Sequence, residues 1–170
     1  MKHLRFDDAL RTGIAHNLAR AAAAPLPARG LKRAAVCVIV TDDGEGGATL
    51  VVTLRAKHLN AHSGQYALPG GRVDPGESAT EAALREAREE INLELAQDAI
   101  LGRLDDYPTR SGFLITPIVA WAPQGAAMSA NSAEVAAIYR IPLSDLGQPG
   151  LPEFVAIPES DQPVVRYPLL

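Results

Sequence analysis

The sequence of residues 70–93 is Gly70-Gly71-Arg72-Val73-Asp74-Pro75-Gly76-Glu77-Ser78-Ala79-Thr80-Glu81-Ala82-Ala83-Leu84-Arg85-Glu86-Ala87-Arg88-Glu89-Glu90-Ile91-Asn92-Leu93. A glycine-rich loop leads into a short and very acidic segment. Ser78 and Glu81 have the spacing of a capping box, which predicts a helix that starts at Ala79. Asn92 readily adopts the left-handed conformation that closes a helix. The stretch therefore predicts a tight loop followed directly by an acidic helix.

The acidic residues of this helix gather on one side of it. At about 100° per residue, Glu86, Glu89 and Glu90 fall within an arc of roughly 100°. Arg85 and Arg88 are expected to point away from the centre of that arc. The apolar residues of another face are predicted to be buried: Ala83, Leu84, Ala87 and Ile91.

This clustering of acids is unfavourable for an isolated helix. Like charges three or four residues apart cost roughly 0.2–0.5 kcal/mol for each pair. Glu89 and Glu90 also lie in the last turn, where the helix dipole disfavours anions by about 0.3–1 kcal/mol each. Divalent cations would remove both penalties, and carboxylates suit Mg²⁺ or Mn²⁺. The helix therefore predicts a metal site.

The composition limits the class of protein to which the chain can belong. At 170 residues the chain is most simply one domain, and 47% hydrophobic with 21% charged residues is typical of globular proteins. A net charge of −4 provides no basic field for nucleic acid. No apolar run approaches the ~20 residues of a membrane span, and the N-terminus does not have the pattern of a signal peptide. The one cysteine, Cys37, is expected in the core, and the cytoplasm is the expected location.

Hydrophobic periodicity predicts the remaining elements. A helix is expected over residues 6–23 and one helical turn over 143–146. Strands are expected over residues 33–41, 49–55, 100–107, 113–122, 134–141 and 164–167. Pro117 lacks a backbone donor, which indicates a sheet edge or a bulge. We expect a single domain over 1–170, with an N-terminal helical extension at 1–30 and a loosely ordered tail at 147–170.

Six charged or glycine positions of the central stretch have the spacing of a known motif. Gly71, Glu77, Arg85-Glu86 and Glu89-Glu90 resemble the Nudix box, G-x5-E-x7-R-E-U-x-E-E-x-G-U, in which U is a bulky aliphatic residue. The departures are Asn92 for the last glycine and Ala87 for an aliphatic residue. The resemblance implies an α/β/α sandwich on a mixed sheet. It also implies hydrolysis of a nucleoside diphosphate linked to another moiety.

The same resemblance implies roles for individual residues. The expected ligands of Mg²⁺ or Mn²⁺ are the carbonyl of Gly70 and the carboxylates of Glu86, Glu89 and Glu90. Arg85 is expected to orient a glutamate. Which glutamate acts as the base varies across the family; we favour Glu89 and keep Glu134 as the second candidate.

The lead-in at residues 50–71 is similar to the extra motif of coenzyme A diphosphatases, in which a strand ending in L-T-x-R is followed by a loop running into F-P-G-G. A basic loop beside the metal site suits the phosphates of coenzyme A, and arginine suits bidentate phosphate contacts. The expected substrate-binding residues are Arg55, Lys57, His62 and Gly71. Asn60 and Leu68 depart from the subgroup, which usually has arginine and phenylalanine there. Other nucleoside diphosphate derivatives and nucleoside triphosphates remain as alternative substrates.

Two further alternatives concern the whole chain. A Nudix-fold binding module without turnover would be expected to lose acids of the box, whereas this chain keeps all of them. Family members generally end in a second helix that covers the other face of the sheet, and the sequence after the last predicted strand does not contain one. Either the chain is truncated, or the N-terminal helix or a partner subunit covers that face, so the expected state is a monomer or a homodimer.

Overall fold

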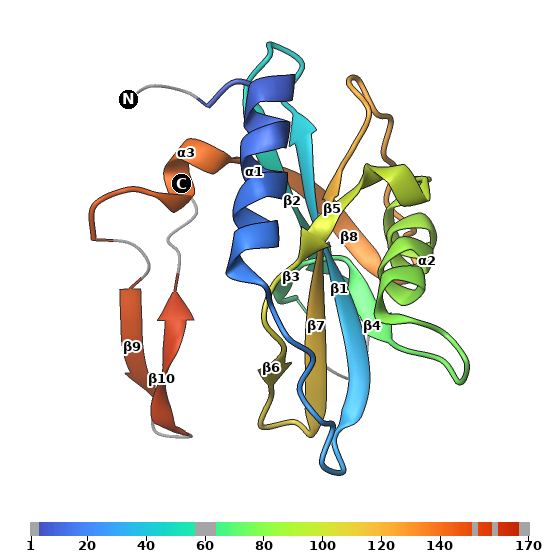
Figure 1. Cartoon of the computed structure of the whole chain (residues 1–170), viewed down its shortest axis with the longest axis vertical. Coiled ribbons are helices and arrows are strands. Elements are labelled where there is room, and N and C mark those ends of the chain that lie inside the picture. The colour runs from blue at the N-terminus through green and yellow to red at the C-terminus, as the bar shows by residue number, and fades with distance from the viewer. Residues whose placement is uncertain (1–3, 57–63, 151–152, 158–159, 167–170) are drawn as a thin grey trace.

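A computed structural model of the chain describes residues 4–56, 64–150, 153–157 and 160–166. Its centre is a sheet of eight strands flanked by helices (Figure 1). The strands of this sheet are β1 (Lys32–Asp42), β2 (Ala48–Arg55), β3 (Tyr66–Ala67), β4 (Gly70–Arg72), β5 (Ile100–Arg103), β6 (Tyr107–Pro108), β7 (Phe113–Trp121) and β8 (Val135–Pro142). The helices are α1 (Asp8–Ala21), α2 (Ala79–Ile91) and α3 (Leu143–Leu146), with a 3₁₀ turn, η1 (Gln97–Ala99).

The sheet is mixed. Its strand order is β3-β2-β1-β7-β5, and β8 adds to β2, β4 to β1 and β6 to β7. The central pair β1 and β7 is parallel, while the other pairs are antiparallel. The predicted class, an α/β fold on a mixed sheet, is confirmed. No helix within the described residues is long and apolar enough to cross a membrane.

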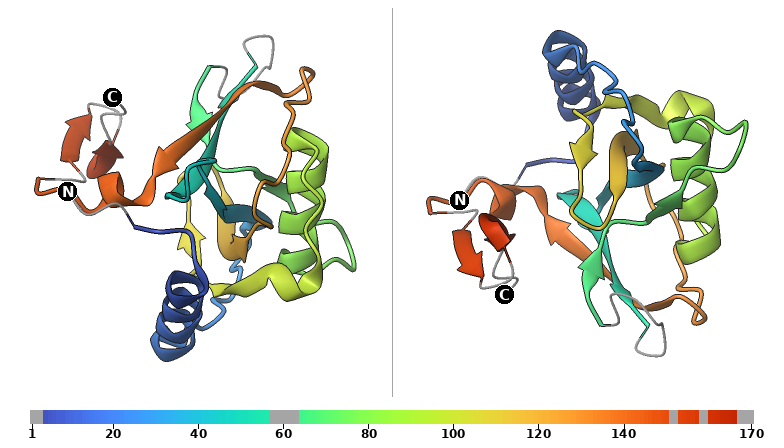
Figure 2. Two further views of the ribbon diagram at one scale, coloured as in Figure 1. Left: turned by 90° about the horizontal axis from the view of Figure 1, so that it is seen from above. Right: turned by 90° about the horizontal axis from the view of Figure 1, so that it is seen from below.

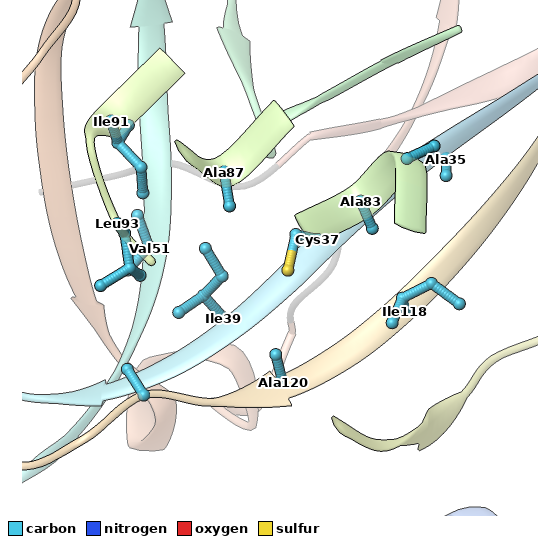
Figure 3. Close-up of a cluster of buried hydrophobic side chains, with 12 residues drawn as sticks. Ala35, Cys37, Ile39, Val51, Ala83, Ala87, Ile91, Leu93, Ile118 and Ala120 are labelled. Atoms are coloured by element: carbon cyan, nitrogen blue, oxygen red, sulfur yellow. The ribbon is translucent and has the colours of Figure 1, made fainter. Parts of the chain in front are cut away.

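The main core lies between α2 and the sheet (Figure 3). It is formed by small and β-branched residues, which let the helix approach the strands closely. Those with no exposed surface are Ala35, Cys37, Ile39, Val51, Ala82, Ala83, Ala87, Ile91, Ala120 and Ala122. Burial raises the pKa of the Cys37 thiol to about 12. Cys37 is therefore a core residue, as its apolar surroundings in the sequence predict.

Helix α1 packs on the opposite face of the sheet from α2 (Figure 2). Alternation along a strand sends neighbouring residues to opposite faces, so Ile39 faces α2 whereas Val40 joins the cluster under α1. Phe6 stacks on Trp121 with ring centroids 4.1 Å apart. Part of the second face is thus covered by the N-terminal helix, one of the three possibilities that the sequence left open.

The predicted strand over residues 100–107 is interrupted between β5 and β6. The buried carboxylate of Asp106 in this interval accepts hydrogen bonds from the Leu26 amide at 2.8 Å and the Thr116 hydroxyl at 2.7 Å. Pro117 lies opposite the interruption, and its carbonyl accepts from the Leu104 amide at 3.0 Å. Pro117 is therefore tolerated inside the sheet because its neighbour is broken there, and not because β7 is an edge strand.

The C-terminal segment differs from the prediction. Instead of a loosely ordered tail with one strand at residues 164–167, the structure has an antiparallel pair, β9 (Glu153–Ile157) and β10 (Ser160–Arg166), which forms its own two-stranded sheet (Figure 1). The prediction was wrong because Pro158 and Pro163 made the segment resemble an irregular coil. A proline is tolerated in a strand that has a free edge.

Candidate active site

Helix α2 has the ends that its sequence predicts. The Ser78 hydroxyl accepts from the Glu81 amide at 3.2 Å, and a Glu81 carboxylate oxygen accepts from the Ser78 amide at 2.7 Å. Asn92 follows the last turn with φ 52°, and its amide donates to the carbonyls of Ala87 and Arg88. These caps fix the helical register, and the register decides which acids face the sheet.

Two glycines bring β4 unusually close to its neighbours. A Cβ added to Gly70 would lie 2.5 Å from the carbonyl oxygen of Ala35, and one added to Gly71 would lie 2.1 Å from an oxygen of Glu86. A side chain at Gly70 would therefore clash with the backbone of β1, whereas one at Gly71 would displace the Glu86 carboxylate. The backbone of β4 thereby forms one wall of the space in which Glu86 lies.

Arg85 connects the loop to the acidic helix. Its guanidinium donates to Glu77 at 2.9 Å, Glu86 at 2.9 Å, Glu89 at 3.0 Å and the carbonyl of Arg72 at 2.9 Å. The sequence placed Arg85 away from the centre of the acidic arc, and this was wrong because the long side chain curls back to reach it. These hydrogen bonds raise the pKa of Arg85 and lower that of Glu77.

The acids of α2 have different environments. Glu86 is 9% exposed and Glu90 only 2%, so both belong to the buried side of the helix, whereas the Glu89 side chain is 45% exposed. Leu84, predicted to be buried, is only half-buried and lines a separate surface cleft. Burial raises the pKa of Glu86, and burial together with repulsion from Glu86 raises that of Glu90 to about 7.

Glu134 lies in the turn before β8 and not on the strand itself, which corrects the predicted strand start. Its negative charge contributes to the raised pKa values of Glu86 and Glu90, so the structure brings it to the same acidic cluster. The carbonyl of Glu134 accepts from the Ala56 amide at 2.8 Å, directly after β2.

Asn131 holds this turn against the end of α2. Its side-chain amide donates to the Glu89 carbonyl at 3.1 Å, and its backbone amide donates to the Glu90 carbonyl at 2.9 Å. The carbonyl of Asn131 in turn accepts from the Glu134 amide at 2.9 Å. Sequence reasoning did not identify Asn131 as a site residue. The available signal was its position three residues before Glu134, the second candidate for the base.

On the other side of the cluster, Arg55 ends β2. A guanidinium nitrogen lies 3.8 Å from a Glu90 carboxylate oxygen, and its positive charge opposes the rise in the pKa of Glu90. The Arg55 Nε atom is buried and has no hydrogen-bond partner among the described residues. The other predicted cations of this loop, Lys57 and His62, lie outside the described residues, as does Asn60.

The donor set suits a hard divalent cation. Buried carboxylates that repel one another and a backbone wall made of glycine provide oxygen ligands and an excess of negative charge. Within the described residues, no group of three or more acidic, histidine or cysteine side chains already surrounds one point. One nitrogen of Arg85 donates to both Glu86 and Glu89.

Comparison with known proteins identifies the family. Residues 31–158 match the NUDIX domain, so the chain belongs to the Nudix family. A protein named uncharacterized Nudix hydrolase NudL from Photorhabdus laumondii subsp. laumondii is 44% identical over 98 residues, which is 57% of this chain and 52% of that protein. The chain thus spans about half the length of this relative.

Solved structures show the same fold. The MutT protein from Methanosarcina mazei Go1 has a TM-score of 0.53 and 22% identity over 69% of this chain and 81% of its own. The NUDIX domain of Shewanella oneidensis NrtR, solved in complex with ADP-ribose, has a TM-score of 0.54 and 21% identity over 68% of this chain and 75% of its own.

Proposed function

We propose that this chain hydrolyses the pyrophosphate bond of a nucleoside diphosphate derivative with the help of Mg²⁺ or Mn²⁺. The observation that supports this most directly is the pair of buried carboxylates, Glu86 and Glu90, against the glycine backbone of β4. Two buried and mutually repelling acids are unfavourable in a protein unless they bind a cation or share a proton. Such pairs concentrate at functional sites.

The residues that would hold the cation are the Gly70 carbonyl, Glu86, Glu89 and Glu90. A bound divalent ion supplies charge neutralisation at the phosphates and a lowered pKa of water. Arg85 fixes the orientation of Glu86 and Glu89 through hydrogen bonds of 2.9 and 3.0 Å.

Glu89 is our candidate for the general base because it is the most exposed of the three acids and can reach a solvent water. Glu134 is the second candidate, since its charge acts on the same cluster.

For the substrate we favour coenzyme A or an acyl-coenzyme A, which would give 4′-phosphopantetheine and adenosine 3′,5′-bisphosphate. The support is the resemblance of residues 50–71 to the coenzyme A subgroup and the place of Arg55 beside Glu90. Arg55, with Lys57, His62 and the backbone of Gly71, would contact the phosphates. We also propose that the chain acts as a single domain in the cytoplasm, as a monomer or a homodimer.

A different nucleoside diphosphate derivative is the second candidate. Asn60 and Leu68 replace the arginine and phenylalanine that are usual in the coenzyme A subgroup, which favours a substrate with fewer phosphates. The NUDIX domain of Shewanella oneidensis NrtR binds ADP-ribose and provides one such compound for testing.

The test is a substrate panel with Mg²⁺ and with Mn²⁺, in which mass spectrometry identifies the products. The panel contains coenzyme A, ADP-ribose, a dinucleotide, a nucleotide sugar and nucleoside triphosphates. Release of 4′-phosphopantetheine from coenzyme A supports the favoured substrate, and cleavage of another compound alone supports the second candidate. The Glu90→Gln variant should lose metal-dependent hydrolysis while it keeps the fold. Full activity of that variant would contradict the assignment of Glu90 as a metal ligand.

A further inference from the structure

The two arginines beside the acidic cluster are bonded in different ways. Arg85 donates hydrogen bonds no longer than 3.1 Å to Glu77, Glu86, Glu89 and the backbone of Arg72. Arg55 instead reaches Glu90 at 3.8 Å, beyond hydrogen-bond length, and its buried Nε has no partner among the described residues. A buried donor needs an acceptor, so this nitrogen can donate to a partner that the described residues do not supply.

We propose that Arg55 is a substrate-binding residue that pairs with Glu90 while no divalent cation is bound and turns to the substrate's phosphate when the cation binds. This inference rests on the proposed function. It assigns Arg55 two alternating partners, a carboxylate in the metal-free protein and an anionic phosphate oxygen in the complex.

The charges around Glu90 explain why Arg55 pairs with this carboxylate in the metal-free protein. Glu90 is 2% exposed and is repelled by Glu86 and Glu134. Arg55 makes the ion pair that partly offsets this repulsion. A divalent cation bound at Glu90 would neutralise the carboxylate more strongly and would itself repel the guanidinium. Metal binding therefore weakens the hold of Glu90 on Arg55.

The position of Arg55 explains how its side chain can turn to a phosphate oxygen of the substrate. Its backbone amide donates to the Gln65 carbonyl at 3.0 Å, and its own carbonyl accepts from the Gly64 amide at 3.2 Å. These bonds fix the backbone of Arg55 at the end of β2 against Gly64 and Gln65, which precede β3. The side chain is 27% exposed and loosely paired, so it can change partner without a movement of the sheet. Guanidinium groups bind phosphate through two parallel hydrogen bonds, which would also satisfy the unpaired Nε.

The test compares the wild type with Arg55→Met in two measurements. The first is Mn²⁺ affinity from electron paramagnetic resonance at pH 8.5, without nucleotide. We expect Arg55→Met to bind Mn²⁺ roughly tenfold more tightly because the competing charge is gone. The second is KM for the substrate that the panel identifies, which should rise roughly tenfold with a smaller change in kcat. A merely damaged site would instead weaken Mn²⁺ binding and raise KM together.

Two further variants make the result decisive. Arg140→Met removes the same charge from an exposed position on β8 and should leave both quantities unchanged. Arg55→Lys keeps the charge, so its Mn²⁺ affinity should stay near the wild-type value while KM still rises, because lysine lacks the fork. Unchanged or weaker Mn²⁺ binding by folded Arg55→Met overturns the inference. Absence of saturable Mn²⁺ binding by the wild type would instead refute the proposed function itself.

Discussion

Glu90 should make the metal-free protein less stable as the pH rises. The residue is 2% exposed, and burial with repulsion from Glu86 raises the pKa of its carboxyl from the ordinary value of 4.5 to about 7. Below pH 4.5 the group is protonated in both the folded and the unfolded chain and has no effect. Between pH 4.5 and 7 the folded chain binds more protons, so the free energy of unfolding falls as the pH rises. Above pH 7 the decrease in the free energy of unfolding is complete.

The size of the effect follows from the gap between the two pKa values. Each pH unit of difference corresponds to ~1.4 kcal/mol, so ionised Glu90 destabilises the folded state by at most about 3 kcal/mol. Glu90→Gln replaces the carboxylate by a neutral group of the same shape. At pH 8 without metal, the variant should therefore be more stable than the wild type by up to about 3 kcal/mol. For a chain of this size, that corresponds to roughly 6–12 °C in Tm.

The assay is thermal and urea unfolding in EDTA at pH values from 4.5 to 8.5. The stability of Glu90→Gln minus that of the wild type should grow from near zero at pH 4.5 to its full value above pH 7. Glu94→Gln is the matched control, because this exposed acid lies just beyond the helix and its substitution should change stability little. If Glu90→Gln is equally or less stable at every pH, the burial argument for this acid is wrong.

Three other substitutions test the frame of the site. Gly71→Ala would place a methyl group 2.1 Å from an oxygen of Glu86 and so displace this carboxylate. Metal-dependent activity should fall by at least about tenfold while circular dichroism stays unchanged. Wild-type activity would contradict the close approach of Gly71 to Glu86. Asn92→Ala keeps φ at 52° without a favourable residue and should lower the free energy of unfolding by about 1–2 kcal/mol, whereas Asn92→Gly should retain more stability than Asn92→Ala in the same urea titration. Phe6→Ala removes the stack on Trp121 and should cost about 2 kcal/mol in urea unfolding; no change would show that α1 is not held there.

Local sequence explains why much of the fold and part of the site are predictable. The capping box, the glycine pair and Asn92 act through neighbouring residues, so the bounds of α2 follow from sequence alone. Buried β-branched runs likewise predict β1 and β7 to within a residue at either end. The interruption at Asp106 is not predictable in this way. Its partner Leu26 lies 80 residues away in the sequence.

The sequence by itself determined the Nudix spacing and hence the chemical groups of the site, because a helix of known register fixes which acids lie near one another. The sequence did not determine how deeply each of these acids is buried. Glu90 lies at the centre of the buried face and Glu89 at its exposed rim, and this difference depends on where α2 meets the sheet.

The tertiary structure alone decided that Arg55, thirty-five residues before Glu90, pairs with it. This contact depends on β2 and α2 converging at one place, whereas the bonds of Arg85 to Glu86 and Glu89 lie within α2. Coulomb interactions act through space and depend on burial, so their partners and strengths become defined only when the chain has folded.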